Sequence, residues 1–205
     1  MVLAELNRQE LLRDLAVCGC GLADERSTRF AAEGAHDPTA TRYFVLEQLF
    51  AQLDLDESSH LLDVGCGKGR ALAYFAEAKL PGRATGVELD PDLARCALAW
   101  TESFDQLDVI EGSALAIPLR GYSHFYLFNP FDSPILERFV EKIEAETRRP
   151  IMLCHMSDNG ENYLFMGRNG WRIQSEGWIH TYQGEPIFNC PQHWSIWRFD
   201  PRPSN

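Results

Sequence analysis

Residues 60–70 read HLLDVGCGKGR, and this stretch decides the fold. Its first five residues form a short apolar run that stops at glycines, which is typical of a buried parallel strand. Gly65, Gly67 and Gly69 then alternate with single residues, and an alanine-rich helical pattern follows over 70–79. Glycines in such a loop let the backbone pass close under a ligand, and the next helix offers free N–H groups at its N-terminus. We therefore predict a nucleotide-type loop between a strand and a helix.

The spacing of these glycines separates the loop from two other nucleotide-binding loops. The dinucleotide fingerprint is G-x-G-x-x-G, whereas this chain has G-x-G-x-G, so its third glycine comes one residue early. A phosphate-binding loop needs Ser or Thr after its lysine, and here Lys68 is followed by Gly69. We therefore expect that NAD is not the cofactor.

An acid at the end of the next strand agrees with a nucleotide-type loop. Residues 84–88 read ATGVE, which predicts a second short strand that ends at Glu88. An acid at this place accepts hydrogen bonds from both hydroxyls of a ribose. Glycines also serve purely structural turns, and that is the alternative for the loop taken alone. Strand, loop, helix, second strand and terminal acid together predict a ribose-bearing cofactor.

Strands and helices alternate along most of the chain. The expected elements are helices over 3–15, 45–53 and 70–79, helices that begin at Asp90 and Ser133, and strands over 60–64, 84–88, 107–110, 125–128 and 151–154. Asp90 and Ser133 are capping residues that precede proline, which is typical of a helix start. The alternation predicts βαβ units, and hence a doubly wound α/β domain with a parallel sheet and right-handed crossovers.

The C-terminal part has a different composition. Four of the five tryptophans lie between Tyr163 and Phe199. The runs 171–182 and 193–199 predict two strands joined by a long loop, and hence an antiparallel edge of the sheet. The tryptophans are most simply the core of this edge.

Length and composition are those of an ordinary globular protein. The chain has 205 residues, of which 45% are apolar and 24% charged. We expect a single domain over 1–205, with an N-terminal helical cap (1–56) before the α/β core (57–205). No apolar run is long enough to span a membrane, and the first residues carry charges where a signal peptide is apolar. The sequence therefore predicts a cytoplasmic protein.

The charge balance bears on the choice of partner. Thirty acids against 19 bases give a net charge of −11, and no block of Lys or Arg reverses it locally. A broadly acidic surface repels nucleic-acid phosphates and anionic lipid. We therefore expect a small-molecule amine or a basic protein or peptide as the partner, and neither nucleic acid nor a membrane. The oligomeric state is left open.

The six cysteines indicate a reducing compartment and no metal site. Cys18 and Cys20 form the only close pair, and no second pair or histidine cluster completes a metal site. Cys66, Cys96 and Cys154 lie in apolar patterns, which predicts small buried side chains. Reduced thiols in a cytoplasm are the plain interpretation.

The chain resembles the class I S-adenosylmethionine-dependent methyltransferases over about residues 36–199. The stretches that carry the resemblance are LLDVGCGKGR (61–70), GVELDPD (86–92), VIEGSAL (109–115) and YLFNPF (126–131). The CGKGR form, with HDPTATRY (36–43) upstream, is similar to a bacterial branch described as a methyltransferase domain. The resemblance implies a Rossmann-like methyltransferase fold, with seven mostly parallel strands in the order 3-2-1-4-5-7-6, N-terminal helices and an antiparallel C-terminal edge. It also implies S-adenosylmethionine as cofactor and S-adenosylhomocysteine as product.

The resemblance assigns roles in cofactor binding. Asp63 matches the acid that orients the amino-acid end of the cofactor, Glu88 matches the ribose ligand, and Leu89 matches a residue that packs on adenine. Ser113 stands where the family commonly has an Asp that bonds the adenine amino group. Residues 36–43 are either a flap over the cofactor or a helix start capped by Thr39. The implied cofactor-binding residues are Asp63, Gly65, Cys66, Gly67, Gly69, Glu88, Leu89, Ser113, Ala114, Asn129, Thr39 and Tyr43.

Asn129-Pro130-Phe131, directly after the fourth expected strand, is the candidate catalytic motif. It is similar to the N/D-P-P-Y/F motif of enzymes that methylate amino groups, with one proline missing. In those enzymes the Asn side-chain oxygen and the proline carbonyl accept hydrogen bonds from an amino group and aim its lone pair at the methyl. Phe131 would stack on a planar substrate or contact the path of the methyl. Asn-Pro is also an ordinary turn former after a strand, and both interpretations stay open.

Several other side chains are weaker candidates. His155 follows the fifth strand and is either a general base or a hydrogen-bonded loop residue. Asp132 is either a base or a neighbour of the helix cap. Trp178 and Tyr182 either belong to the core of the edge or reach the substrate mouth.

The function predicted is methyl transfer from S-adenosylmethionine to an amino nitrogen or another small polar nucleophile. Methyl transfer from a sulfonium is an in-line displacement, for which the enzyme chiefly holds nucleophile, methyl and sulfur in line. Two alternatives use the same fold: an aminopropyltransferase-like enzyme, and a cofactor-binding or regulatory protein whose catalysis has decayed. Fold alone does not decide among them.

Overall fold

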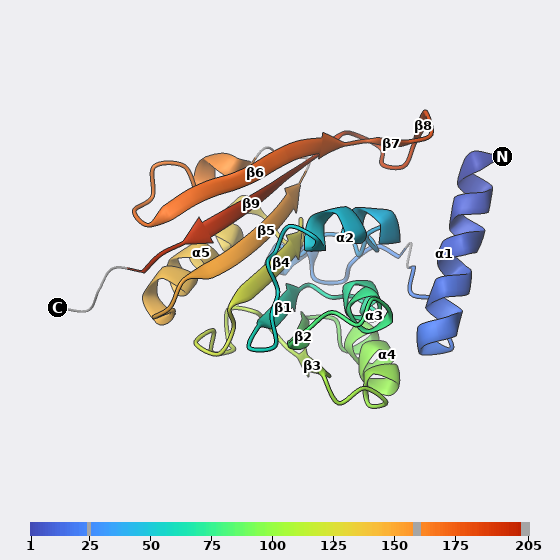
Figure 1. Ribbon diagram of the computed structural model, residues 1–205, viewed down its shortest axis with the longest axis horizontal. Coiled ribbons are helices and arrows are strands. Elements are labelled where there is room, and N and C mark those ends of the chain that lie inside the picture. The colour runs from blue at the N-terminus through green and yellow to red at the C-terminus, as the bar shows by residue number, and fades with distance from the viewer. Residues whose placement is uncertain (24–25, 158–160, 202–205) are drawn as a thin grey trace.

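A computed structural model describes residues 1–23, 26–157 and 161–201 of the chain. Within these residues the main sheet has seven strands in the order β3-β2-β1-β4-β5-β9-β6 (Figure 1). The strands are β1 His60–Val64, β2 Arg83–Glu88, β3 Leu107–Glu111, β4 His124–Phe128, β5 Ile151–Ser157, β6 Trp171–Ile179 and β9 Gln192–Phe199. Strands β1 to β5 are parallel, and β9 is antiparallel to both β5 and β6. This is the strand order that the resemblance implied.

Helices cover both faces of the sheet. They are α1 Val2–Cys18, α2 Tyr43–Phe50, α3 Arg70–Glu77, α4 Pro91–Thr101 and α5 Ser133–Glu146, with short 3-10 turns η1 Ala31–Glu33 and η2 Glu161–Leu164. Between β6 and β9 in the sequence the chain forms a separate two-stranded sheet from β7 Thr181–Tyr182 and β8 Glu185–Pro186. The side chains of α2, α3 and α4 share a core with one face of the sheet, and those of α5 share a core with the other. Leu61 and Leu62 enter these two cores in turn, because neighbouring residues of a strand point to opposite faces.

Local patterns predicted most of these elements. The five parallel strands and the helices of the core begin and end within a few residues of the expected positions. The side chain of Asp90 accepts a hydrogen bond from the Asp92 N–H at 2.8 Å, so it caps α4 as predicted. Ser133 is the first residue of α5 with Pro134 next to it, so the helix starts where expected, but the cap position belongs to Asp132 and not to Ser133. The doubly wound α/β domain with an antiparallel edge is therefore confirmed.

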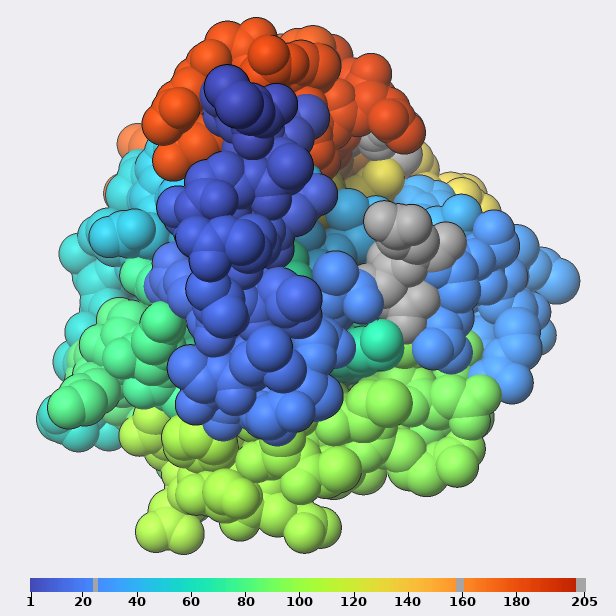
Figure 2. Space-filling model, turned by 90° about the vertical axis from the view of Figure 1, so that its right-hand side faces the viewer, coloured from blue at the N-terminus to red at the C-terminus, as the bar shows by residue number. Residues whose placement is uncertain are grey.

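Helix α1 docks through a polar face, which its leucine spacing did not predict. Glu10 and Asp14 are 4% and 1% exposed, whereas Leu11, Leu12 and Leu15 are 46%, 50% and 44% exposed. A buried carboxylate is tolerated only when it is paired, and both acids meet arginines of the core, as described below. The space-filling view shows α1, in dark blue, lying lengthwise on this side of the molecule (Figure 2).

Other expectations are corrected by burial. Cys96 lies exposed on α4, while Cys66 and Cys154 are buried as predicted. Trp178 is 67% exposed and packs on the ring of His193, so it is not core. Among the described residues there is no helix long and apolar enough to cross a membrane, and no group of three potential metal ligands.

Candidate functional site

A cavity of about 500 Å³ lies at the carboxyl ends of the parallel strands. In open α/β sheets ligands bind at this edge, where the strand order reverses. Here β1 is the central strand of that reversal, with β2 on one side and β4 on the other. Twelve of the predicted site residues line the cavity: Thr39, Asp63, Gly65, Cys66, Gly67, Glu88, Leu89, Ser113, Ala114, Asn129, Pro130 and Phe131.

The glycine loop turns under one end of this cavity. Gly65 and Gly67 have φ values of 74° and 56°, which L side chains rarely adopt. A Cβ at position 65 would lie 2.8 Å from the Cβ of Pro130, so only glycine fits there. The cofactor loop and the candidate catalytic motif are therefore in direct contact.

Glu88 ties the glycine loop to the end of β2. One carboxylate oxygen accepts a hydrogen bond from the Gly67 N–H at 2.7 Å, and the other accepts one from the Asp90 N–H at 2.8 Å. The side chain is buried and lines the cavity. Its burial raises the pKa of the Glu88 carboxyl. Each carboxylate oxygen has two lone pairs, so acceptor capacity remains toward the cavity.

Asp63 places a second buried carboxyl on the cavity wall. Asp63 is the second-to-last residue of β1 and is 4% exposed. Burial, and then the charge of Glu88, raise the pKa of Asp63 to about 8. A ligand cation beside it would favour the ionised form. Two acids at this end of the cavity thus fit a ligand that carries an ammonium group and hydroxyls.

The part of the cavity lined by the residues that follow β2 and β3 is less polar. Leu89, Ala114 and Leu115 line it together with Ser113. The Ser113 Oγ accepts a hydrogen bond from the Leu115 N–H at 3.2 Å, and its own hydroxyl hydrogen is left for another acceptor. A planar heteroaromatic ring fits between such apolar side chains.

Two predicted cofactor contacts do not line the cavity. Gly69 has a φ of 90° and opens α3, and a Cβ there would lie 2.9 Å from the ring of Trp100, so its role is to let the helix pack closely. Tyr43 is 1% exposed and its hydroxyl donates to Asp14 at 2.8 Å, so it points to α1. Helix α2 begins at Tyr43 with Arg42 as cap, so Thr39 is not the helix cap. Thr39 lies in an irregular segment that lines the cavity, as a flap would.

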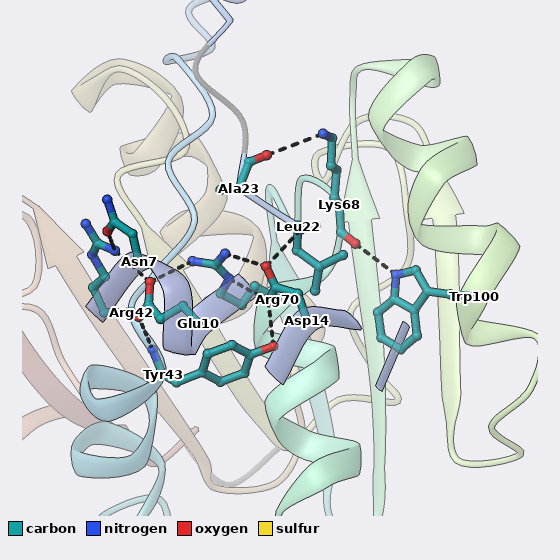
Figure 3. A network of polar contacts seen from close by, with 10 residues as sticks. All are labelled: Asn7, Glu10, Asp14, Leu22, Ala23, Arg42, Tyr43, Lys68, Arg70 and Trp100. Carbon is teal, nitrogen blue, oxygen red and sulfur yellow. Dashed lines mark hydrogen bonds and ion pairs between the residues drawn. The ribbon is translucent and has the colours of Figure 1, made fainter. Parts of the chain in front are cut away.

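A buried ion-pair network joins α1 to the helix that follows the glycine loop (Figure 3). Arg70 is 5% exposed and donates to Asp14 at 2.7 Å, while its ion pair with Glu10 spans 3.4 Å. Arg42 donates to the same Glu10 at 2.6 Å. Asp14 also accepts the backbone N–H of Leu22 at 2.9 Å, and Leu22 lines the cavity. The network therefore holds the segment that leads from α1 to Leu22, where the chain joins the wall of the cavity.

Residues 129–132, here called the acceptor segment, follow β4 on the far side of the glycine loop. Asn129 has a φ of 42°, which is rare for a residue other than glycine. Its backbone N–H donates to the Met156 carbonyl at 2.8 Å, and its Oδ1 accepts from the Ser157 hydroxyl at 3.4 Å. The Phe131 ring packs near that of Phe139, with 6.0 Å between the ring centroids.

Residues 34–36, here called the strap, form a hydrogen bond to the Pro130 carbonyl, which is one of the predicted hydrogen-bond acceptors for the substrate. The backbone N–H of His36 donates to the Pro130 carbonyl at 3.1 Å. A carbonyl oxygen has two lone pairs, so this bond leaves one acceptor position, and a role of the carbonyl toward a substrate amine stays a prediction. His36 also meets Asp132, whose carboxylate lies 2.9 Å from the ring; Asp132 stands at the N-cap position of α5, but its side chain makes no cap hydrogen bond.

The remaining candidates lie away from the cavity. His155 is 1% exposed, packs near the ring of Phe165 and lies 3.5 Å from Glu161, so it is no base at the cavity. Tyr182 packs on Phe44 with 4.8 Å between ring centroids. His155, Tyr182 and Trp178 are not among the residues that line the cavity.

Comparisons with known proteins agree with this geometry. Residues 62–125 match a family model described as a methyltransferase domain. A comparison with curated protein sequences gave no match. Among solved structures, the chain is similar to an RNA methyltransferase from Salinibacter ruber in complex with S-adenosyl-L-homocysteine, with a TM-score of 0.57 and 15% identity over 80% of this chain and 95% of that one.

Two further structures are of the same fold. TrmN from Thermus thermophilus has a TM-score of 0.65 and 14% identity over 86% of this chain and 54% of that one. The N-methyltransferase NodS from Bradyrhizobium japonicum WM9 has a TM-score of 0.59 and 11% identity over 78% and 95%. At these identities the likeness is one of fold. The chain thus has the Rossmann-like fold of these methyltransferase structures, and its residues 62–125 match the methyltransferase domain model.

Proposed function

We propose that the protein is an S-adenosylmethionine-dependent methyltransferase that binds its cofactor in the cavity at the carboxyl ends of β1, β2 and β3. The observation that carries the proposal is the arrangement of Glu88, whose carboxylate holds the glycine loop while it lines the cavity. The family match over 62–125 supports the same reading.

The donor set fits each part of this cofactor. Asp63 would pair with the ammonium group of the methionine end, and Gly65 and Gly67 would let that end approach the backbone. Glu88 would accept hydrogen bonds from the ribose hydroxyls. Leu89, Ser113 and Ala114 would contact the adenine. When bound, the cofactor supplies a methyl group on a sulfonium, which is its chemistry in every such enzyme.

The acceptor segment would orient the nucleophile. Asn129 and Phe131 line the cavity on the side of the glycine loop where β4 ends, and Pro130 contacts Gly65. The Asn129 Oδ1 would accept a hydrogen bond from an amino group and so direct its lone pair. In the transfer a nitrogen–carbon bond forms as the carbon–sulfur bond breaks, sulfur keeps the electron pair, and the nitrogen's proton passes to water. Orientation by fixed groups lowers such a barrier.

An amino nitrogen on a small molecule or a basic peptide is the acceptor that we propose. The net charge of −11 disfavours an extended polyanion. At the cavity both signs are present, since Glu33 and Asp37 are exposed acids while Arg26 and Arg138 are exposed bases. RNA belongs in the assay for that reason, and because one of the similar structures is an RNA methyltransferase. A cytoplasmic location and a division into a cap (1–56) and a core (57–205) stay predictions.

A cofactor-binding protein without turnover is the second candidate. The observation that favours it is the Pro130 carbonyl, which the His36 N–H already occupies. The two candidates share the cofactor site and differ in the acceptor segment.

A transfer assay with labelled S-adenosylmethionine separates them. The panel holds small amines, basic peptides and RNA, and each is tested with wild type, Asn129→Ala and the control Asn189→Ala, an exposed asparagine outside the cavity. We expect transfer to an amine or a peptide that Asn129→Ala lowers and Asn189→Ala does not. Cofactor binding without transfer to any member would favour the second candidate.

A further inference from the structure

The strap is fastened to the acceptor segment by backbone hydrogen bonds in both directions. The Asp132 N–H donates to the Gly34 carbonyl at 2.8 Å, and the His36 N–H donates to the Pro130 carbonyl at 3.1 Å. Gly34 has a φ of 77°, which favours glycine, and a Cβ there would also lie 2.6 Å from the end of the Ile135 side chain. Residues far apart in the sequence thus pair in an isolated antiparallel bridge between Ala35 and Phe131.

The side chain of His36 adds two contacts of its own. Its Nδ1 lies 2.9 Å from the backbone carbonyl oxygen of Asn129, and its Nε2 lies 2.9 Å from the Asp132 Oδ1. A carbonyl and a carboxylate only accept hydrogen bonds, so a ring nitrogen that carries a hydrogen donates it to its partner. The imidazole ring therefore bridges the first and last residues of the acceptor segment.

We infer that His36 is a positioning residue for the acceptor segment: its Nδ1–H holds the Asn129 carbonyl and so sets where the Asn129 side chain points in the cavity. The inference rests on the proposed function, because Asn129 is the group proposed to orient the nucleophile. The strap thereby makes the N-terminal residues part of the acceptor site.

The conformation of Asn129 explains why such a hold is needed. With a φ of 42°, Asn129 is in the left-handed region, which asparagine adopts more readily than most residues but which still depends on contacts that fix the backbone. The Met156 carbonyl fixes its N–H and the His36 ring fixes its carbonyl. The next residue, Pro130, touches Gly65 of the cofactor loop, so a rotated Asn129 peptide would disturb the gap between loop and acceptor.

Two substitutions separate the two ring contacts. The amide nitrogen of Asn can take the place of Nδ1, so His36→Asn keeps a donor for the Asn129 carbonyl and loses the contact with Asp132. The amide nitrogen of Gln can take the place of Nε2, so His36→Gln does the reverse. Both keep the backbone bond to Pro130. His180→Gln, at a histidine outside the cavity, is the control.

Turnover should follow the Nδ1 contact. We expect His36→Gln to lower kcat by about 10- to 100-fold, which is the loss expected from a small misplacement of a reacting group, with the Kd for S-adenosylhomocysteine within about twofold of wild type. His36→Asn should stay within about threefold of wild type, and His180→Gln should equal it. A merely structural clasp would predict equal losses in Asn and Gln variants, which would overturn the inference.

Hydrogen exchange gives a second readout in the protein without ligand. We expect the backbone amide of Asn129, which donates to the Met156 carbonyl, to exchange at least tenfold faster in His36→Gln and near the wild-type rate in His36→Asn. Unchanged exchange in His36→Gln would refute the inference even if no substrate is found. Failure of wild type to bind S-adenosylhomocysteine would instead refute the proposed function and leave the exchange result standing.

Discussion

The Gly67 N–H donates a hydrogen bond of 2.7 Å to the carboxylate of Glu88, so the acid at the end of β2 holds the glycine loop as well as facing the cavity. The same carboxylate accepts the Asp90 N–H at 2.8 Å. Two backbone donors on one carboxylate explain how a buried acid is tolerated here. They also mean that a change at Glu88 alters the ligand site and the loop together.

Asp63 makes the stability of the ligand-free protein depend on pH. Its pKa is raised to about 8 in the folded protein, above the usual value of 3.8. Between those values the folded state holds a proton that the unfolded state has released, so this group's contribution to the free energy of unfolding falls as pH rises from about 4 to 8. We expect Asp63→Asn to match wild type near pH 4 and to be more stable by more than about 1 kcal/mol at pH 8.

Chemical denaturation at the two pH values tests this. The same variant should bind S-adenosylhomocysteine more weakly at pH 8, since it cannot pair with the ammonium group. A stability difference that is the same at both pH values would show that Asp63 ionises normally.

The contact between Gly65 and Pro130 predicts a severe effect of one methyl group. Gly65→Ala places a Cβ 2.8 Å from Pro130 at a φ of 74°. The loop must then move away from the acceptor segment, so we expect a loss of about 1–3 kcal/mol in stability and weaker ligand binding. Gly121→Ala, where the structure has open space and no positive φ, is the control. Equal melting temperatures for both variants would argue against this packing.

The ion-pair network predicts an asymmetry between buried and exposed acids of α1. Asp14→Ala removes the partner of buried Arg70 and of Tyr43, so we expect a loss of about 3–5 kcal/mol. Glu5→Ala breaks exposed contacts with Arg8 and Gln9 and should change stability far less than Asp14→Ala. Urea denaturation measures both. A small effect of Asp14→Ala would mean that α1 is not docked through its polar face in solution.

Under the proposed function, Asn129 orients the nucleophile and contributes little to the binding of the cofactor. Asn129→Ala should lower kcat by about 30- to 1,000-fold, equivalent to about 2–4 kcal/mol in the barrier, with cofactor affinity nearly unchanged. Asn129→Asp should be less damaging, because a carboxylate still accepts a hydrogen bond from an amine. Full turnover by Asn129→Ala on the best substrate would make the acceptor segment only a turn.

Local patterns were enough for the parallel strands, the core helices and the glycine loop that lines the cavity, whereas the strand order came from the family resemblance. The apolar run of β1, the glycines after it and the acid that ends β2 follow one another closely, so their spacing alone indicated the loop and its acid. The cap of α4 was predicted for the same reason. Each of these depends on residues that are close in the sequence.

Contacts between distant residues were not predictable from spacing. The leucines of α1 suggested an apolar face, but Arg70, 56 residues beyond Asp14, pairs with that acid and turns the polar side inward. The contact of His36 with the carbonyl of Asn129 spans 93 residues and leaves no trace in periodicity. The sequence does show a glycine at position 34 and a histidine at position 36, but nothing near them indicates that the histidine contacts Asn129.

The binding of S-adenosylhomocysteine tests the central claim most directly. In titration calorimetry we expect wild type to bind one molecule, Glu88→Ala to bind about 5- to 150-fold more weakly through the loss of about 1–3 kcal/mol, and Glu88→Gln to lie between them. Glu111→Ala, at the exposed acid beside Glu88 on β3, should equal wild type, and NAD should not compete. No binding by wild type, or equal affinity in wild type and Glu88→Ala, would contradict the account.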